Sequence, residues 1–540
     1  MSSCAPGFEN ATEQREPVDL KVHGEIPSWL SGILYRTGPG TTRIPRTADP
    51  SKVVDIHHWF DGLAMHHRFE IHSETQRVSY RSRKGAEDVE RYIADTGEFP
   101  GYSFGQQRDP CQSLFRKFFS VWDAASGALG PSGRNVNVTL TPDMPGWNAV
   151  TKGLPILSPS AAKSPMTPRY LVAKTDSDRL QLLDPETLDP LAQVTYSQLD
   201  SRLDGVLAAA HACRDAVSGD FYNFVCKFAG RFPTYKVFCI RGHDGGVDIL
   251  AEIKDAPPAY IHSFAITERF IVLCVWQAYY KHYGMSILLN KNLAQSITTD
   301  WDPTADTLIY VIDRMNGGVI AIYKTQPFFC FHHLNAFDDP ATGDVVIDMS
   351  VYPNNTIIEL TKYASLRDLG ALTTPFTYAR ARRFRLPAPL SSPPQSGTRD
   401  AVVEYTFPIE RNIELPVVAP RVRNRPYRFA YGIHKVHIPG RHTLSDALIK
   451  LDMAAGAAGG EGTKVWEVPD GTPSEPIFVP RPGAAPGEEG EDDGVLLTVV
   501  LDERAVQSRL VILDARKMRE VARAEMDTVF PIGFHGVFCG

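Results

Sequence analysis

Short strand-like runs separated by turns fill most of this 540-residue sequence and restrict what it can fold into. β-branched and aromatic residues dominate the runs, whereas Gly, Pro, Asn and Asp dominate the segments between them, a pattern typical of strands joined by tight turns. Helical periodicity is nearly absent, and residues 111–125 are the best candidate for a helix. The predicted strands are 170–174, 180–183, 221–228, 234–240, 248–253, 270–276, 308–313, 319–323, 345–351, 402–407, 448–453, 476–479, 495–501 and 509–513.

One closed all-β architecture accommodates this many strands, because no linker separates two regions of different composition. We expect a β-propeller, with a barrel as the alternative. The chain is expected to form a single domain over residues 1–540, in which residues 1–20 are a flexible N-terminal segment. No repeat is regular enough for the blades to be counted from the residues alone.

The overall charge argues against some classes of partner. A net charge of -7 gives the chain no general affinity for nucleic acid or anionic lipid. Eight cysteines without a C-x-x-C pair fit reduced thiols in a cytoplasmic protein. The first residues lack a basic start followed by an apolar block, and no run reaches the roughly 18 to 20 apolar residues of a spanning helix. We therefore expect neither a signal peptide nor a transmembrane helix.

Four of the sixteen histidines lie in apolar, strand-like segments: His211, His262, His332 and His535. A buried imidazole needs a carboxylate, a carbonyl or a metal for its ring nitrogens. Taken singly, each is more often a satisfied core histidine than a ligand, and the spacing is far too long for a zinc finger. Only a closed fold can bring them together. We expect residues 530–538 to form the last strand, with His535 as the last of four metal ligands.

Two glutamates lie in apolar segments where an unpaired charge would be costly, namely Glu414 and Glu475. Metal-bound histidines usually donate their second ring N–H to an outer carboxylate, carbonyl or water. The alternative is that each glutamate caps a strand or pairs with an arginine. Both interpretations remain open at this point.

The sequence resembles the carotenoid cleavage oxygenases, non-haem iron(II) enzymes, over nearly the whole chain. The resemblance lies in N-terminal motifs and in the segments around the four histidines. These motifs are VHGEIP at 22–27, GILYRTGPG at 32–40, HWFDGLAM at 58–65, YIHSF at 260–264, FHHLNA at 331–336 and FHG at 534–536.

The resemblance implies a seven-bladed β-propeller whose iron-bearing face is covered by loops and short helices. It also implies that His332 rather than His333 is a ligand, and that Asp176 orients His262. The family has a glutamate at the position of Asp176, so we expect its hydrogen bond to be longer or bridged by water. The implied iron(II) ligands are His211, His262, His332 and His535, and the implied outer carboxylates are Asp176, Glu414 and Glu475.

By the same resemblance, oxygen adds across a conjugated C=C bond of a carotenoid or apocarotenoid, either torulene-like or β-carotene-like, to give two aldehydes. Four neutral imidazoles leave Fe(II) its full charge and leave coordination positions open. No catalytic residue beyond the metal ligands is then expected. The protein's role is to position an apolar polyene beside iron with O2 and to exclude bulk water.

Other activities share these motifs. A stilbenoid-cleaving dioxygenase would use a Tyr/Lys pair on the phenol, for which Tyr102 is a candidate, but the position expected for the lysine holds Thr175. A retinoid isomerohydrolase has the same propeller and iron site but does not use O2. A non-catalytic carotenoid-binding propeller is the third alternative, and the intact histidine set argues against it.

Aromatic segments at 118–122 and 276–289 are candidates for a tunnel mouth that dips into a membrane or lipid body, with ordinary core as the alternative. Cys111, in the sequence RDPC, resembles a cysteine that can be lipidated in the animal branch. A single acyl chain gives only marginal anchoring, so a free or buried thiol is the alternative. We expect at most a peripheral membrane contact.

Overall fold

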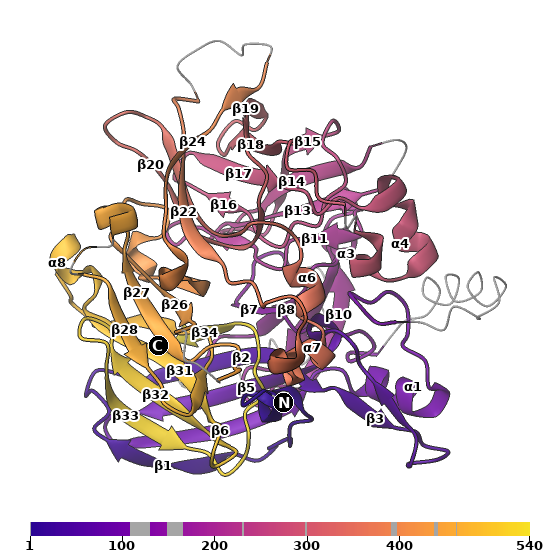
Figure 1. The fold of residues 1–540 in the computed structure, drawn as a ribbon, viewed down its shortest axis with the longest axis vertical. Helices are drawn as coiled ribbons and strands as arrows, with labels where there is room; N and C mark the ends of the chain where they lie inside the picture. The colour runs from indigo at the N-terminus through magenta and orange to yellow at the C-terminus, as the bar shows by residue number, and fades with distance from the viewer. Residues whose placement is uncertain are drawn as a thin grey trace.

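The computed structural model describes residues 2–107, 130–147, 166–228, 232–297, 300–389, 397–436, 441–458, 460, 462–485 and 487–540. This part of the chain is built mainly from antiparallel β-sheets that surround a common centre (Figure 1). The fourteen predicted strands between residues 170 and 513 are present to within two residues at either end, whereas the predicted last strand at 530–538 is not. The predicted helix at 111–125 lies outside the described residues. An all-β propeller-like fold is therefore confirmed.

Five separate sheets of four or five strands are present in the described chain, and each is formed largely by consecutive strands. The first holds β7 (Thr139–Pro142), β8 (Leu171–Lys174), β9 (Arg179–Leu183) and β10 (Pro190–Thr195). The second holds β11 (Leu207–Ala208), β12 (Cys213–Arg214), β13 (Phe221–Lys227), β14 (Thr234–Ile240) and β15 (Val247–Ile253). The third holds β16 (Ala265–Ile266), β17 (Phe270–Val275), β18 (Thr307–Asp313), β19 (Val319–Thr325) and β23 (Arg399–Asp400). The fourth holds β20 (Phe329–Asp338), β21 (Val345–Tyr352), β22 (Arg380–Leu386) and β24 (Val402–Thr406), and the fifth holds β25 (Glu414–Val418), β26 (Phe429–His434), β27 (Ala447–Asp452) and β28 (Lys464–Glu467).

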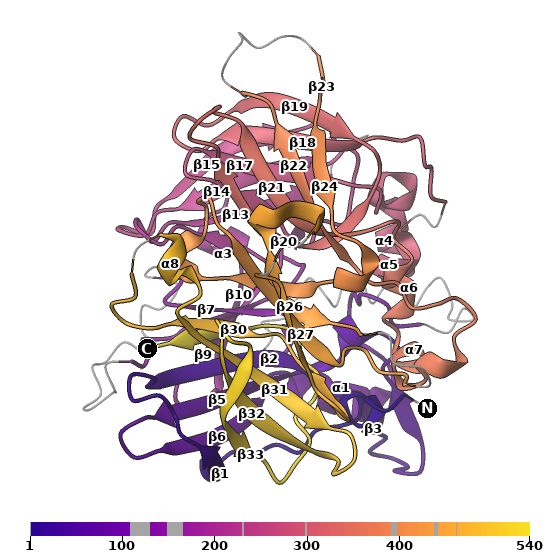
Figure 2. The same ribbon diagram turned by 60° about the vertical axis from the view of Figure 1, so that its left-hand side comes forward.

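The remaining large sheet is continuous and joins the two ends of the chain (Figure 2). Its ten strands are β29 (Gly471–Pro473), β30 (Ile477–Pro480), β31 (Gly494–Asp502), β32 (Gln507–Asp514), β33 (Arg519–Glu525), β1 (Val18–Gly24), β6 (Arg77–Lys84), β5 (Leu63–His72), β2 (Gly32–Thr41) and β34 (Gly536–Cys539). The expected seven separate blades are therefore not found, and five blades accompany this larger sheet. The reason is that β1 pairs with β6 through residues 18–20 and with β33 through residues 21–24. One strand therefore joins an N-terminal and a C-terminal group of strands into a single sheet.

Neighbouring sheets contact one another through their inner strands. β7 contacts β34, β34 contacts β30, β30 contacts β25, β25 contacts β20, and β20 contacts β16. The circle is completed by a bridge between His211 and Ser263 and by a hydrogen bond of 2.6 Å from Thr139 Oγ1 to the carbonyl of Ala210. The segments that carry the four histidines thus surround one centre, far apart in sequence but adjacent in space.

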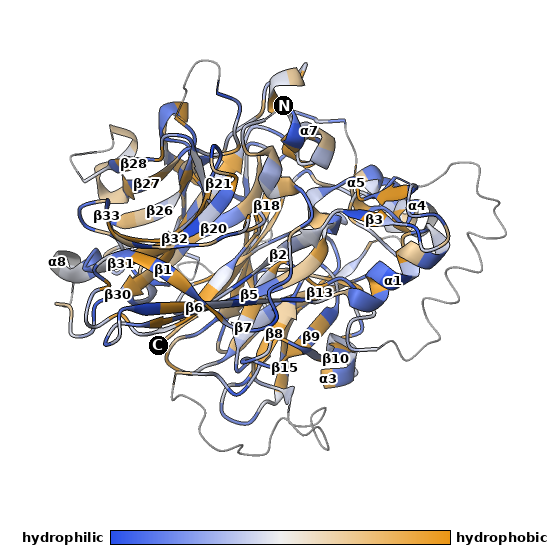
Figure 3. Cartoon of the chain, turned by 90° about the horizontal axis from the view of Figure 1, so that it is seen from below, coloured by the Kyte–Doolittle hydropathy of each residue, from blue (hydrophilic) through white to orange (hydrophobic). Residues whose placement is uncertain are grey.

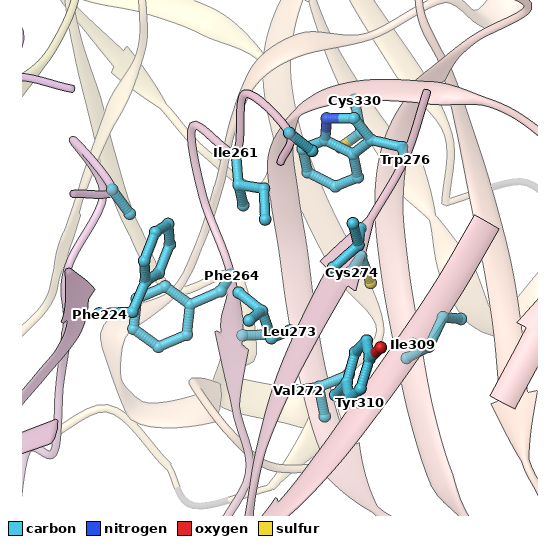
Figure 4. Close-up of a cluster of buried hydrophobic side chains, with 14 of the residues drawn as sticks. Phe224, Ile261, Phe264, Val272, Leu273, Cys274, Trp276, Ile309, Tyr310 and Cys330 are labelled. Carbon is cyan, nitrogen blue, oxygen red and sulfur yellow. The ribbon is translucent and has the colours of Figure 1, made fainter. Parts of the chain in front are cut away.

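Close packing between sheets explains why some strands are apolar along their whole length. β17 and β21 are buried at every residue, because side chains on both of their faces meet a neighbouring sheet. Figure 4 shows part of this core, in which Phe264, Leu273 and Trp276 lie between strands of different sheets. The indole N–H of Trp276 donates to the carbonyl of Tyr260 at 2.9 Å, so the core also fixes the segment that leads to His262.

Helices are short and lie at the periphery. The longest in the described chain, α1 (Glu87–Thr96), is largely hydrophilic, whereas hydrophobic stretches lie along strands (Figure 3). The others are α3 (Tyr196–Leu199), α4 (Met285–Asn290), α5 (Leu293–Ser296), α6 (Ile357–Leu360), α7 (Tyr363–Arg367) and α8 (Glu488–Glu491). A small hairpin of β3 (Arg43–Pro45) and β4 (Val53–Asp55) packs near α1. None of the helices in the described chain is long and apolar enough to cross a membrane.

The N-terminal segment packs on the body of the fold, although the sequence suggested that it is flexible. Residues 5–8 form a short 3-10 helix, and Cys4 and Phe8 are buried. The backbone N–H of Ser2 donates to the carbonyl of Arg367 in α7 at 2.8 Å. This contact fastens the start of the chain beside the helix that follows α6.

Deleting residues 536–540 should destabilise the protein by about 2–5 kcal/mol, because the β34 ladder is lost and each hydrogen bond contributes roughly 0.5–1.5 kcal/mol. β34 pairs with residues 33–36 of β2. The full-length His535→Ala variant is the matched control, since it loses the imidazole but keeps the strand. Urea unfolding of both proteins measures the difference, and equal stability of truncated and full-length chains would contradict this role of β34.

Candidate metal centre

Four histidine side chains meet at the centre of the fold. One ring nitrogen from each of His211, His262, His332 and His535 lies within 4.8 Å of the others, and the Nε2 atoms of His211 and His535 are 3.0 Å apart. His333 is turned away, with its Nδ1 2.8 Å from Ser263 Oγ. The structure therefore brings together the four histidines singled out from the sequence, and at the FHH motif it selects His332.

The chain positions these rings mostly at the edges of strands rather than within them. His211 lies between β11 and β12, and its N–H donates to the carbonyl of His262 at 3.2 Å. His262 comes shortly before β16, and His332 lies within β20. The expected final strand at 530–538 is corrected, because the strand covers only 536–539 and His535 precedes it. Before β34, the chain is held to β2 by two backbone hydrogen bonds: the N–H of Thr37 donates to the carbonyl of His535, and the N–H of Phe534 donates to the carbonyl of Thr37.

Three of the histidines donate their outer ring nitrogen to a buried carboxylate. The pairs are His262 Nδ1 with Asp176 Oδ1 at 2.8 Å, His332 Nδ1 with Glu414 Oε2 at 2.6 Å, and His535 Nδ1 with Glu475 Oε1 at 2.7 Å. In the neutral imidazole a proton on Nδ1 leaves Nε2 as a lone-pair donor. Each of these rings therefore presents a basic nitrogen to the centre. No carboxylate in the described chain is hydrogen-bonded to His211.

The contact of Asp176 is direct, although we expected a longer or water-bridged one from its shorter side chain. The backbone compensates for the missing methylene. Ser177 forms a bridge with Leu207, and the N–H of Asp178 donates to the carbonyl of Val206 at 3.2 Å. These contacts hold the segment after β8 against the segment that leads to His211, which brings the carboxylate within reach of His262.

A second donor holds the free oxygen of each carboxylate. The hydroxyl of Tyr260 donates to Asp176 Oδ2 at 3.0 Å, and that of Tyr352 donates to Glu414 Oε1 at 3.0 Å. For Glu475 Oε2 the donors are Arg36 Nη1 at 3.1 Å and the N–H of Gly536 at 2.9 Å. None of these supporting donors was predicted from the sequence. Tyr260 and Arg36 lie inside the motifs at 260–264 and 32–40, and this position was the one sign that they serve the site.

Burial keeps two of these histidines neutral. It lowers the pKa of His211 and of His535 well below the usual range, and the neighbouring imidazoles reinforce the effect. Burial acts to raise the pKa of Glu414, but His332, the N–H of Leu415 and the hydroxyl of Tyr352 together outweigh it, and the net pKa is lowered. At Glu475 burial prevails over the Arg36 guanidinium and raises the pKa to about 7.

The donor set fits a bound metal ion. His332 Nε2 is buried and has no hydrogen-bond partner in the described chain. Several neutral imidazoles cannot satisfy one another through lone pairs that point at a common centre, whereas a cation satisfies all of them at once. Imidazole nitrogens suit iron, zinc, copper and nickel.

The centre lies between two cavities of different size and lining. One is an apolar pocket of about 80 Å³, which is lined by His262, by Trp59 and by the rings of Phe60, Phe331 and Phe534. The other is a larger cavity of about 820 Å³ with a mixed lining, in which apolar residues accompany His211, Lys174, Thr141 and Arg423. His332 and His535 border both cavities. A molecule in the apolar pocket can therefore reach the centre without entering the larger cavity.

The other residues suggested by the sequence lie away from the centre. Tyr102 is 44% exposed and lines neither cavity. In the segment 276–289, Trp276 and Tyr280 are buried, which agrees with the alternative prediction that they are ordinary core residues. Tyr283 and Met285 in the same segment are 50% and 57% exposed. Residues 118–122 and Cys111 fall outside the described part of the chain.

Replacing His332 with Ala should abolish metal binding, because it removes one of four nitrogens that point at a common centre. His333→Ala is the matched control, since the adjacent ring contacts Ser263 instead. Metal per chain, measured by mass spectrometry of the purified proteins, is expected to fall to the background in the first variant only. Equal metal content in both variants would show that His332 is not a metal ligand.

Asp176→Asn should weaken metal binding by about 10- to 100-fold. A neutral amide oxygen accepts the Nδ1–H of His262 more weakly than a carboxylate does, so it makes the ring a less basic ligand. Asp176→Glu retains the charge and is expected to keep the affinity within a few-fold. Competition with a chelator measures both. Full affinity in the Asn variant would show that this carboxylate does not tune its histidine.

Comparisons with known proteins agree with this architecture. The family described as retinal pigment epithelial membrane protein, RPE65, matches residues 7–540. A carotenoid dioxygenase of Neurospora crassa is 35% identical, covering 98% of this chain and 90% of the relative, and a torulene dioxygenase of Fusarium fujikuroi is 35% identical with 98% and 92% coverage. The cobalt-substituted apocarotenoid oxygenase of Synechocystis has the same fold, with a TM-score of 0.74 at 22% identity, covering 99% of this chain and 98% of that one. The chain therefore belongs to the RPE65/carotenoid oxygenase family.

Proposed function

We propose that this protein is a non-haem iron(II) dioxygenase that cleaves a conjugated C=C bond of a carotenoid or apocarotenoid to two aldehydes. The observation that carries the proposal is a centre of four imidazole nitrogens that opens on an apolar, aromatic-lined pocket. The relatives described as carotenoid and torulene dioxygenases support the same reaction. One O2 and one double bond give two carbonyl groups, so atoms balance without a further co-substrate.

His211, His262, His332 and His535 are the residues that would hold iron, and it would supply O2 activation next to the scissile bond. Asp176, Glu414 and Glu475 fix the tautomer and orientation of three of these rings through the hydrogen bonds described above. Because the carboxylates are themselves held by Tyr260, Tyr352 and Arg36, the imidazoles have little freedom to turn. No side chain is required as nucleophile or acid.

The apolar pocket positions the substrate. Its aromatic rings offer flat faces on which a conjugated chain can pack. Most of its lining is apolar, so water finds few hydrogen-bond partners there and is excluded from the reacting centre. A torulene-like or β-carotene-like polyene meets these requirements.

The whole chain, residues 1–540, acts as one catalytic domain in this proposal, and it works in the cytoplasm with peripheral contact to membranes or lipid bodies. The exposed side chains of Phe232, Tyr283 and Met285 support such a contact, because they present apolar area near α4. A polyene dissolved in lipid could then enter without crossing water.

Incubation of the iron-loaded protein with 18O2 and torulene, β-carotene or a shorter apocarotenal tests the reaction. Both aldehyde fragments are expected to carry label when they are trapped rapidly as oximes, because each takes one atom of O2. His332→Ala should yield none. Cleavage of a hydroxystilbene alone would assign a stilbenoid dioxygenase, and anaerobic conversion of a retinoid ester would assign an isomerohydrolase, so either result would overturn the proposal.

A further inference from the structure

The apolar pocket also has polar lining residues other than Thr361, Glu414 and the metal-site histidines. They lie at the end of β26 and in the segments before β22, β25 and β27, and this part of the lining is called the corner below. Its residues are Thr377, Tyr378, Asn412, His434, Lys435 and Ser445. Polar groups in an apolar pocket are costly unless they have partners, so their hydrogen bonds show which of them are available to a ligand.

Three of these side chains are occupied by the protein. Asn412 Nδ2 donates to the carbonyls of Ile409 at 3.0 Å and Lys435 at 2.9 Å, and its Oδ1 accepts from the N–H of Lys435 at 2.9 Å. The Lys435 amine is paired with Asp446. Ser445 Oγ donates to the carbonyl of Pro473 at 2.8 Å. These groups build the wall of the corner but have little left to offer a ligand.

His434 has one ring nitrogen to spare. The side chain is 4% exposed, and its Nδ1 donates to the carbonyl of Asn412 at 2.8 Å. Burial lowers the pKa of His434, so the ring is neutral and Nε2 is a hydrogen-bond acceptor. Within the described chain, no group donates to Nε2. The charged groups that act on the ring are Asp446, Lys435 and Glu467, of which Asp446 and Lys435 are paired with each other.

Tyr378 supplies the complementary group. Its ring lines the same pocket, and its hydroxyl has no hydrogen-bond partner among the described residues. Burial raises the pKa of Tyr378, so the hydroxyl keeps its proton and remains a donor. Both residues flank the same short segment of chain: the N–H of Ile413 donates to the carbonyl of Ala379, next to Tyr378, at 3.0 Å, and His434 Nδ1 donates to the carbonyl of Asn412 at 2.8 Å.

We propose that His434 and Tyr378 form a subsite for a hydroxyl group on the conjugated substrate. A hydroxyl is both donor and acceptor: its O–H donates to His434 Nε2, and its oxygen accepts from the Tyr378 O–H. A carbonyl or ether can only accept, and a hydrocarbon pairs with neither group. The subsite rests on the proposed function, since it assumes that this pocket holds the substrate, and within the proposed class it predicts a preference for hydroxylated conjugated molecules over the corresponding hydrocarbons.

Two sources of such a hydroxyl can be distinguished, namely the end ring of an oxygenated carotenoid and the phenol of a stilbenoid. The iron-loaded protein is given two matched pairs, β-carotene with its 3-hydroxylated derivative and stilbene with 4-hydroxystilbene. The expected result is a kcat/KM ratio of about tenfold in favour of the hydroxylated member of at least one pair, as one or two net hydrogen bonds would give. The pair that shows the preference identifies the source.

The variants His434→Phe and Tyr378→Phe test whether these residues cause the preference. Each is expected to bring the ratio close to one, mainly by raising KM for the hydroxylated substrate. Ser445→Ala is the matched control, because that hydroxyl lines the corner but is bound to Pro473, and the ratio should stay as in the original protein. Tyr378→Phe removes a single oxygen, so it provides the test even if His434→Phe does not fold.

Binding measured by quenching of protein fluorescence, with and without metal, gives a readout that does not depend on turnover. Tighter binding of the hydroxylated member, lost in the two variants, supports the subsite even if no cleavage occurs, whereas absent cleavage with normal iron content counts against the proposed function alone. An equal ratio in the original protein and the variants, or no preference in either pair by kinetics and binding, would overturn the subsite.

Discussion

The hydrogen bond between a histidine and a buried carboxylate, repeated three times, is the interaction on which the rest of this centre depends. Each pair joins residues that are 60 to 86 positions apart in the chain and that lie in different parts of the ring of sheets. Two of these contacts, His262 with Asp176 and His332 with Glu414, also join segments that belong to different sheets. The third, His535 with Glu475, joins two distant segments that adjoin strands of the ten-stranded sheet.

The carboxylates need their own supports because they are buried. Tyr260, Tyr352 and Arg36 each donate to the second oxygen of one carboxylate, and at Glu475 the N–H of Gly536 shares this role. The support differs in charge, since two neutral phenols serve two of the sites and a buried guanidinium serves the third. His211 stands apart, because it borders the larger cavity and no carboxylate in the described chain binds it. The four imidazoles are thus chemically unequal although they converge on one point.

Two cavities give the centre two faces. His262 borders the apolar pocket and His211 the larger cavity of mixed lining, while His332 and His535 belong to both. The face at the apolar pocket has the more uniformly apolar surroundings. Within the apolar pocket, the satisfied hydrogen bonds of Asn412, Lys435 and Ser445 leave few groups free to choose between substrates. Selectivity then depends on a small number of atoms.

The sequence by itself determined most of the strands and singled out four histidines and two glutamates, because burial of a strand and the cost of an isolated charge are local properties, whereas Asp176 was implied only by the resemblance to the family. The tertiary structure decided the rest. The number of separate blades follows from β1, whose two halves pair with different neighbours. The direct contact of Asp176 with His262, the place of His535 before β34 and the supporting donors all depend on how segments approach after closure. The free nitrogen of His434 likewise becomes visible only when every neighbouring hydrogen bond is known. These features are differences of a few ångströms between residues far apart in the chain, and no local pattern of residue types contains them.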